Sequence, residues 1–168
     1  YEKLIEKFVT WAQKREDIKA AIVVGSRARI DHPSDEWADL DLLVVTSNPE
    51  YYVSRSDWIE NMGTPLLTFI EPTSSGEDLE RRVLYTGMID VDFAIIPLER
   101  AELLRPEADL PPQVRANLAN TFGRGIRVLI DKDGLTATLK EFLSSLGPLV
   151  PQKPSKDEFL QVVNDFLY

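Results

Sequence analysis

The sequence contains no cysteine among its 168 residues, so it has neither disulfide bonds nor thiolate metal sites. Its single histidine, His32, has no catalytic partner nearby in the sequence, and we expect it at the surface. No apolar run approaches the roughly 20 residues that a membrane-spanning helix needs. The first ten residues also lack the basic and then apolar pattern of a signal peptide. We therefore expect a cytoplasmic protein without a membrane partner.

Positive charge is also scarce in this sequence. Lysine and arginine together number 19 against 28 acidic residues, which gives a formal net charge of −9 at pH 7. Binding nucleic acid without sequence preference needs a basic surface, so the composition predicts no nucleic-acid partner. It suits a small cationic partner instead. With 43% hydrophobic and 28% charged residues, the composition is that of a folded domain of ordinary size.

Hydrophobic periodicity predicts a chain that mixes helices and strands. Short apolar runs bounded by turn residues predict strands over residues 20–25, 40–46, 65–72, 80–85, 88–96 and 125–134. Apolar residues at helical spacing predict helices over residues 4–12, 48–63, 98–104, 113–121 and 135–146. The fold class that follows is α+β, with a mixed sheet of about five strands flanked by helices.

The last part of the sequence is rich in proline and predicts a boundary. We expect a domain over residues 1–147, a linker over 148–154 and a helix over 155–168. Ser155 and Glu158 have the spacing of a capping box at the start of this helix. The helix either packs on the same domain or begins a C-terminal helical domain that the sequence leaves incomplete. The domain boundaries given above assume that the helix begins a C-terminal helical domain.

Two pairs of carboxylates stand at the starts of predicted strands. Asp39 and Asp41 point to one face of their strand, about 6–7 Å apart by the rise of a strand. Two such like charges repel each other unless a cation lies between them, and a divalent ion with oxygen ligands is the natural choice. Asp90 and Asp92 repeat the pattern later. If the two strands are neighbours, the carboxylates converge on a Mg²⁺ site; otherwise they are ordinary edge-strand charges.

The turn Gly25–Ser26–Arg27 follows the first predicted strand. Glycine permits a close backbone approach, serine offers a hydroxyl group, and arginine offers a cation that suits phosphate. A phosphate-binding turn beside a Mg²⁺ site is what phosphoryl or nucleotidyl transfer requires, together with a carboxylate that accepts a proton. Arg81 and Arg82 lie on opposite faces of a later strand. One of them is a candidate for a phosphate contact, but by default we expect both to be solvated.

In this order, the turn, Asp39-Leu40-Asp41 and a third aspartate on a later strand resemble the motifs of the nucleotidyltransferase superfamily, which includes DNA polymerase beta. The longer segments GSRA…DEWADLDLLVV and IDVDFAIIPLE look more narrowly like the aminoglycoside 6-adenylyltransferases, the streptomycin-modifying enzymes. The similarity covers about residues 18–100. It implies a nucleotidyltransferase-like sheet followed by a helical C-terminal part, to which only residues 155–168 would belong.

The resemblance also implies a role for each carboxylate. Asp39 and Asp41 would ligate Mg²⁺, and Asp92 would be the general base and a third metal ligand. We choose Asp92 over Asp90 because DFAIIPLE matches the family's strand after its third aspartate.

The substrates follow from the same resemblance. Gly25 and Ser26 would hold the phosphates of a nucleoside triphosphate, ATP, with Arg27 nearby. An aminoglycoside such as streptomycin would accept AMP on a hydroxyl group, and pyrophosphate would leave. In such families the helical C-terminal part supplies much of the antibiotic pocket. Trp37, which lies between the motifs, either lines a nucleotide or acceptor site or has a packing role.

Two other functions stay open on the sequence alone. The same fold serves minimal nucleotidyltransferases that modify a protein or an RNA end, although an acidic chain disfavours RNA. A nucleotide-binding regulator without turnover would keep the fold and lack an acceptor site. The presence of all three candidate aspartates weighs against such a regulator.

Overall fold

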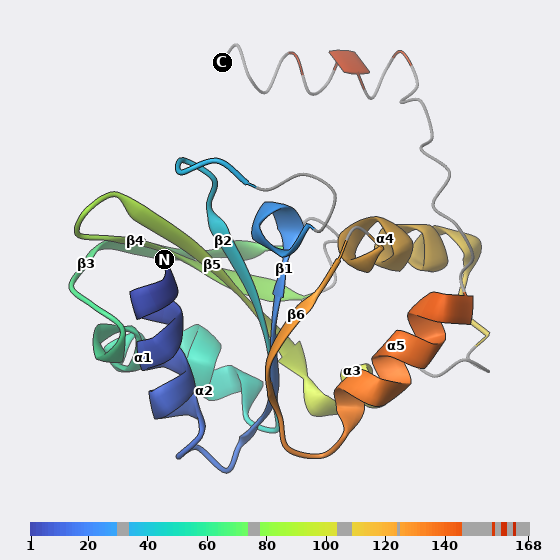
Figure 1. Cartoon of the computed structure of the whole chain (residues 1–168), viewed down its shortest axis with the longest axis horizontal. Helices are drawn as coiled ribbons and strands as arrows, with labels where there is room; N and C mark the ends of the chain where they lie inside the picture. Colours follow the sequence, from blue (N-terminus) through green and yellow to red (C-terminus); the bar gives the residue numbers. More distant parts are fainter. Residues whose placement is uncertain are drawn as a thin grey trace.

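The structure, a computed structural model, describes residues 1–29, 34–73, 78–103, 109–123 and 125–145, together with residues 156, 159, 160 and 163 (Figure 1). The elements in chain order are α1 (Glu2–Ala12), β1 (Ile18–Val24), the 3₁₀ helix η1 (Gly25–Ala28), β2 (Leu40–Thr46), α2 (Pro49–Ser54), the 3₁₀ helix η2 (Asp57–Asn61), β3 (Pro65–Pro72), β4 (Leu79–Tyr85), β5 (Ile89–Pro97), α3 (Leu98–Glu102), α4 (Pro112–Phe122), β6 (Arg127–Asp131) and α5 (Leu135–Ser145). The predicted linker over 148–154 lies outside the described residues, as does most of the helix predicted over 155–168. Those boundaries stay predictions.

Six strands form one sheet, in the order β3-β4-β5-β2-β1-β6, where the sequence predicted about five. β2 and β5 are parallel, and the other neighbouring pairs are antiparallel. The prediction of a mixed sheet in an α+β fold is therefore confirmed. Parallel neighbours need a crossover connection, which α2, η2, β3 and β4 supply here. Because β2 and β5 run the same way, their first residues meet at one end of the sheet.

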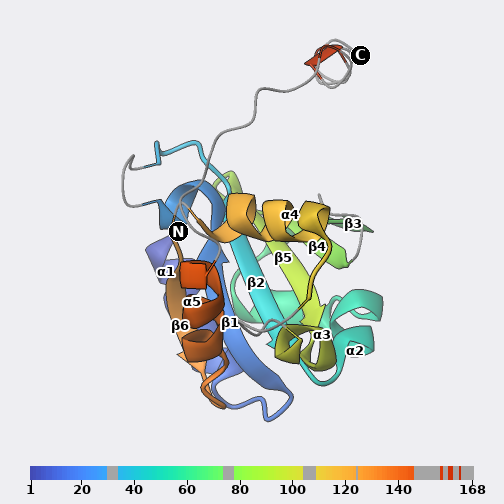
Figure 2. The same ribbon diagram turned by 90° about the vertical axis from the view of Figure 1, so that its right-hand side faces the viewer.

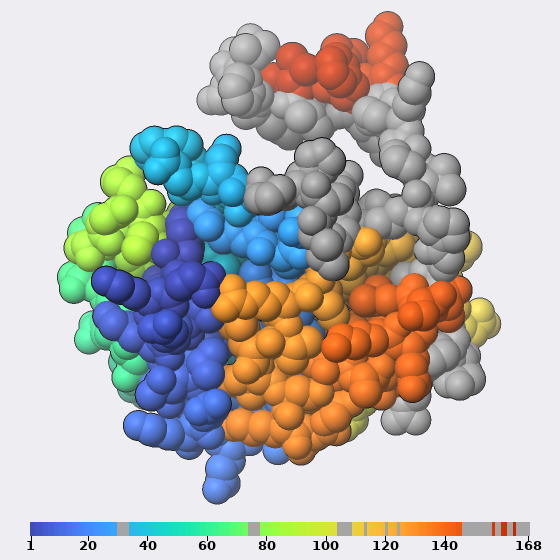
Figure 3. Space-filling view, in the orientation of Figure 1, coloured from blue at the N-terminus to red at the C-terminus, as the bar shows by residue number. Residues whose placement is uncertain are grey.

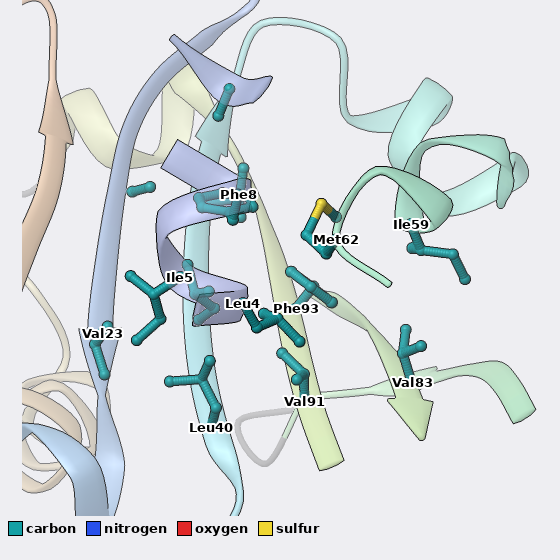
Figure 4. Packing of buried hydrophobic residues seen from close by; sticks show 14 of the residues in the cluster. Leu4, Ile5, Phe8, Val23, Leu40, Ile59, Met62, Val83, Val91 and Phe93 are labelled. Carbon is teal, nitrogen blue, oxygen red and sulfur yellow. The ribbon is translucent and has the colours of Figure 1, made fainter. Parts of the chain in front are cut away.

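The main hydrophobic core lies on the face of the sheet that α1, α2 and η2 cover. Phe8 of α1, Trp58 of η2 and Phe93 of β5 meet there, with ring centroids 6.0 Å apart for Phe8–Phe93 and 5.0 Å for Trp58–Phe93. Figure 4 shows Phe8 and Phe93 together with aliphatic side chains such as Leu4 and Val91 between α1 and the strands. This packing fixes the strands that carry the candidate site. Among the described residues, no helix is both long enough and apolar enough to cross a membrane.

A smaller apolar cluster lies on the opposite face of the sheet. Ile22 and Val24 of β1 pack there against Phe122 of α4 and Leu139 of α5. Figure 2 looks onto this face and shows α4 and α5 in front of the strands. Helices therefore cover both faces of the sheet, but the buried apolar cluster on this second face is much smaller than the main core.

The helix predicted over 48–63 is wrong, because two short helices, α2 and η2, replace it. Arg81 donates a hydrogen bond from Nε to the carbonyl oxygen of Tyr52, at 3.2 Å. Trp58 donates one from Nε1 to the carbonyl oxygen of Arg55, at 2.9 Å. In a longer helix these carbonyl oxygens would accept hydrogen bonds from backbone N–H groups. Here they accept hydrogen bonds from side chains instead. Arg81 is thereby only 5% exposed, which corrects the expectation that it is solvated.

Candidate active site

Three carboxylates meet where β2 and β5 begin. Asp41 and Asp92 are directly paired across the two parallel strands, and Asp39 precedes β2 by one residue. Each residue offers a carboxylate oxygen, and these oxygens lie within 4.8 Å of one another. The structure therefore brings together Asp39 and Asp41, which strand alternation placed on one face, and Asp92, which the family resemblance selected. Two opposite ligands of one Mg²⁺ ion are roughly 4.2 Å apart, so the spacing of these oxygens is close to what one such ion needs.

The electrostatics of the cluster also favour a cation. Burial raises the pKa of Asp41 to about 6, and the negative charges of Asp39 and Asp92 add to that effect. Burial likewise raises the pKa of Asp92, although a hydrogen bond from Arg82 acts in the opposite direction. Carboxylates that repel one another in a partly buried site are stabilised in their ionised form by a cation bound between them.

Gly25, the first residue of η1, lies against Asp41 of this cluster. Gly25 has a φ of +66°, and a Cβ atom there would lie 1.9 Å from Oδ2 of Asp41. Only glycine lets the backbone approach the carboxylate so closely. The hydroxyl oxygen of Ser26 is buried and has no hydrogen-bond partner among the described residues. A buried polar atom without a partner is rare and calls for an explanation, of which a bound ligand is one.

The sequence predicted that Arg27 contacts a phosphate group. In the structure its guanidinium group contacts groups of the protein. Its Nε donates to the carbonyl oxygens of Ala38 and Asp39, each at 2.9 Å. Its guanidinium group lies over the ring of Tyr1, with Cζ 3.4 Å from the ring centroid. In this structure Arg27 thus holds the backbone that leads into Asp39. A phosphate contact of Arg27 stays a prediction.

The loop before Asp39 is held in place and presents an aromatic ring. The carboxylate of Asp35 accepts hydrogen bonds from the backbone N–H groups of Trp37 and Ala38, at 3.0 and 2.9 Å. Trp37 is 81% exposed, so it has no packing role in this structure. Figure 3 shows this loop, in cyan, at the surface above the N-terminal residues.

Arg82 is a site residue that sequence reasoning missed. It is not solvated, because its Nε donates to Oδ1 of Asp92 at 2.8 Å. Its Nη1 donates to Oε1 of Glu71 at 3.2 Å. Alternation along β4 places Arg82 and Glu80 on the same face, but only the register of β4 on β5 sets Arg82 opposite Asp92. The sequence alone does not report this register, so the contact between Arg82 and Asp92 was not predicted.

Glu80 is a second acidic group that the sequence did not single out. Burial raises its pKa to about 7, and the negative charges of Asp92 and Glu71 add to this. It lines a cavity of about 910 Å³ together with Asp41 and Asp92. The remaining wall is mostly apolar and comes from the second face of the sheet and from α3, α4 and α5. The carboxylates thus stand at the wall of a space large enough for a nucleotide-sized ligand.

A family model described as streptomycin adenylyltransferase matches residues 1–168. Among solved structures, the chain is similar to an aminoglycoside 6-adenyltransferase from Bacillus subtilis, with 18% identity and a TM-score of 0.47. That match covers 61% of this chain and 37% of the other. The chain is also similar to terminal uridylyl transferase 4 from Trypanosoma brucei, with 12% identity, a TM-score of 0.34 and coverage of 99% and 65%. Both matches thus span less than two thirds of the other chain. No curated protein matches the chain.

Proposed function

The chain belongs to the streptomycin adenylyltransferase family, and from this premise we propose that it transfers AMP from ATP to a hydroxyl group of an aminoglycoside such as streptomycin. The observation that carries the proposal is the convergence of three carboxylates within 4.8 Å, against a turn in which Gly25 lies at Asp41 and the next residue, Ser26, has a buried hydroxyl without a partner among the described residues. An acidic cluster alone serves many purposes, but a turn that offers a glycine and a serine hydroxyl suits a phosphate group.

The proposed reaction breaks a phosphoanhydride bond of ATP and forms a phosphoester bond to the acceptor. The acceptor hydroxyl oxygen forms a bond to the α-phosphorus, and the bond between that phosphorus and the bridging oxygen breaks. Pyrophosphate leaves with the bridging oxygen, and the proton of the hydroxyl passes to Asp92. Burial raises the pKa of Asp92, which makes its carboxylate a better proton acceptor than an exposed aspartate.

The donor set of the site fits a divalent cation. Asp39, Asp41 and Asp92 would hold Mg²⁺, because all three offer hard carboxylate oxygens at short mutual distances. When bound, Mg²⁺ neutralises charge on the triphosphate and helps to orient it. Gly25 and Ser26 would lie along the phosphates, since glycine leaves room at Asp41 and the serine hydroxyl is free to donate.

The acceptor is proposed to be a polycation because the surroundings of the site are acidic. Glu80 lines the same cavity as Asp41 and Asp92, and the chain carries a net charge of −9. Such a field attracts a polycation such as an aminoglycoside. Trp37 adds an exposed aromatic ring close to Asp39 in sequence, which suits a contact with a sugar ring or an ammonium group.

The test is a transfer assay on the full chain with Mg²⁺, each nucleoside triphosphate in turn and streptomycin. We expect pyrophosphate release and a gain of one adenosine monophosphate in the mass of streptomycin. Asp92→Asn should lower the rate by roughly 100-fold or more, since it removes the proton acceptor and a metal ligand. Asp133→Asn, which changes an exposed aspartate in the turn before α5, is the matched control and should leave the rate unchanged.

The other outcomes separate the alternatives. Binding of a triphosphate without transfer to streptomycin would discard that acceptor and direct the assay to other aminoglycosides. Transfer to a protein or an RNA end would favour the second function that the sequence left open. If no acceptor of any kind gained a nucleotide, the proposal would be wrong and a non-catalytic regulator would be favoured.

A further inference from the structure

A chain of ion pairs crosses three neighbouring strands and ends at the carboxylate cluster. Glu71 of β3 pairs with Arg82 of β4, with Nη1 3.2 Å from Oε1. Arg82 pairs in turn with Asp92 of β5, with Nε 2.8 Å from Oδ1. Asp92 is the direct neighbour of Asp41 across the β5–β2 pair. The outer strand β3 is thus connected to the site through charged side chains.

Both ends of the Arg82 guanidinium group are held. Charge-assisted hydrogen bonds of this length are roughly twice as strong as neutral ones, and the planar guanidinium group directs them in fixed directions. Because Glu71 holds Nη1, the group is restrained from rotating away from Asp92. Asp92 is itself only 7% exposed, so its carboxylate has little freedom apart from this contact.

The pairing distinguishes the two oxygens of the Asp92 carboxylate. Oδ1 accepts the hydrogen bond from Arg82, and no hydrogen bond to Oδ2 is found among the described residues. The contact with Arg82 occupies Oδ1, whereas the described contacts leave Oδ2 open. Oδ2 is therefore the oxygen available to the reaction.

A contact between Arg82 and the triphosphate is the competing explanation. Two carboxylates already neutralise the single positive charge of Arg82, so little attraction is left for a phosphate group. Its side chain is also less exposed than that of a free surface arginine, at 31%. The geometry favours a role through Asp92 over a contact with substrate.

We propose that Arg82 is a positioning residue that fixes Oδ1 of Asp92, and so presents Oδ2 to the acceptor hydroxyl, with Glu71 bracing Arg82 from the outer strand. This proposal rests on the proposed function, because Asp92 is the proton acceptor there. It assigns a catalytic contribution to β3 and β4, which hold none of the three aspartates.

The test compares substituted chains in the same transfer assay, with kcat and KM measured separately for the triphosphate and the acceptor. Arg82→Gln should lower kcat by roughly 30-fold or more, because the orientation of Asp92 is lost, and leave KM for the triphosphate within about three-fold, because all three carboxylates remain. Arg82→Lys should recover part of the loss, since an ammonium group still donates to Oδ1. Glu71→Gln should lower kcat by a smaller factor, roughly three- to ten-fold.

The matched control is Arg55→Gln. Arg55 pairs with Asp57 at 3.2 Å on the surface, so the substitution removes the same type of ion pair away from the carboxylates. It should leave kcat and KM unchanged. Thermal unfolding of every variant shows whether a loss of rate reflects a loss of fold. If Arg82→Gln does not fold, Arg82→Lys and Glu71→Gln carry the comparison.

Two results would overturn the proposal. A rise of about ten-fold or more in KM for the triphosphate with kcat retained would make Arg82 a phosphate contact. Unchanged kinetics in Arg82→Gln and Glu71→Gln would show that the pairing has no catalytic role. An inactive wild-type chain is a different result, because it refutes the proposed function and, with it, this inference.

Discussion

Gly25 occupies a position where a larger side chain would collide with the candidate metal ligand Asp41. Its backbone has a φ of +66°, and a Cβ atom would stand 1.9 Å from the carboxylate. Gly87, in the β4–β5 turn, also has a positive φ of +84°, but nothing lies within 4 Å of a Cβ atom there. The two glycines thus share the backbone requirement and differ only in the space beside them.

This difference predicts separate outcomes for two alanine substitutions. Gly25→Ala and Gly87→Ala should each lose about 1 kcal/mol of stability, because alanine disfavours a positive φ. Gly25→Ala should in addition lower the transfer rate by roughly 100-fold, because Asp41 must move away from the other two aspartates. Thermal unfolding and kcat for both variants check this. Equal rates for the two variants would contradict it.

Strand β5 has two functionally different faces at the scale of a single element. Phe93 packs in the main core against Phe8 and Trp58, whereas Ala94 lines the cavity on the other side. Alternation along a strand produces this division, since successive side chains point to opposite faces. Two neighbouring residues of β5 thus face the main core and the cavity, respectively.

Substitutions at these two positions should therefore affect different quantities. Phe93→Ala should lower the free energy of unfolding by about 3–5 kcal/mol, the usual loss for a buried phenylalanine. Ala94→Leu should change it by less than about 1 kcal/mol, because the new side chain enters open space, but it should raise KM for a substrate roughly ten-fold. Urea denaturation and steady-state kinetics measure both. A stable Phe93→Ala variant would contradict the division of faces.

Local pattern was sufficient to predict several elements but not their pairing. The bounds of β2 and β3 agree with the sequence prediction, because prolines and a change from polar to apolar residues mark their ends. The single helix predicted over 48–63 failed because Arg81, which is distant in sequence, binds a carbonyl group of that segment. No periodicity within a segment reports a contact of that kind.

The same distinction applies to the candidate site. Asp39 and Asp41 were accessible to prediction, because two residues with one between them share a face of any strand. Arg82 was not, because its role depends on the register between β4 and β5. The backbone partners of Arg27 were missed for a similar reason, since they belong to a loop and not to a regular element.

For the whole molecule, the raised pKa values set how stability depends on pH. Burial raises the pKa of Asp41 from 3.8 to about 6 and that of Glu80 from 4.5 to about 7. The folded state therefore holds these protons more tightly than the unfolded state, and stability falls as pH rises through these values. Asp17 and Glu2 have lowered pKa values and are already ionised above pH 5.

Without Mg²⁺, the free energy of unfolding should fall by about 1–2 kcal/mol between pH 5 and pH 8. Adding Mg²⁺ should reverse this loss, and its stabilising effect should grow with pH, because the ligands bind metal only when deprotonated. Urea denaturation at several pH values, with Mg²⁺ or with a chelator, provides the measurement. Asp41→Asn should flatten the metal-free profile. A metal-free profile that rises from pH 5 to pH 8 would contradict the assignment.

The parallel pairing of β2 with β5 has a consequence for how the chain folds. The two strands lie far apart in the sequence, with β3 and β4 between them, and a contact over such a separation forms slowly. The hairpin of β4 and β5 can form from neighbouring residues, but Asp41 and Asp92 meet only when the centre of the sheet closes. A nascent or partly unfolded chain therefore presents scattered aspartates, and its ability to chelate metal arises together with its tertiary structure.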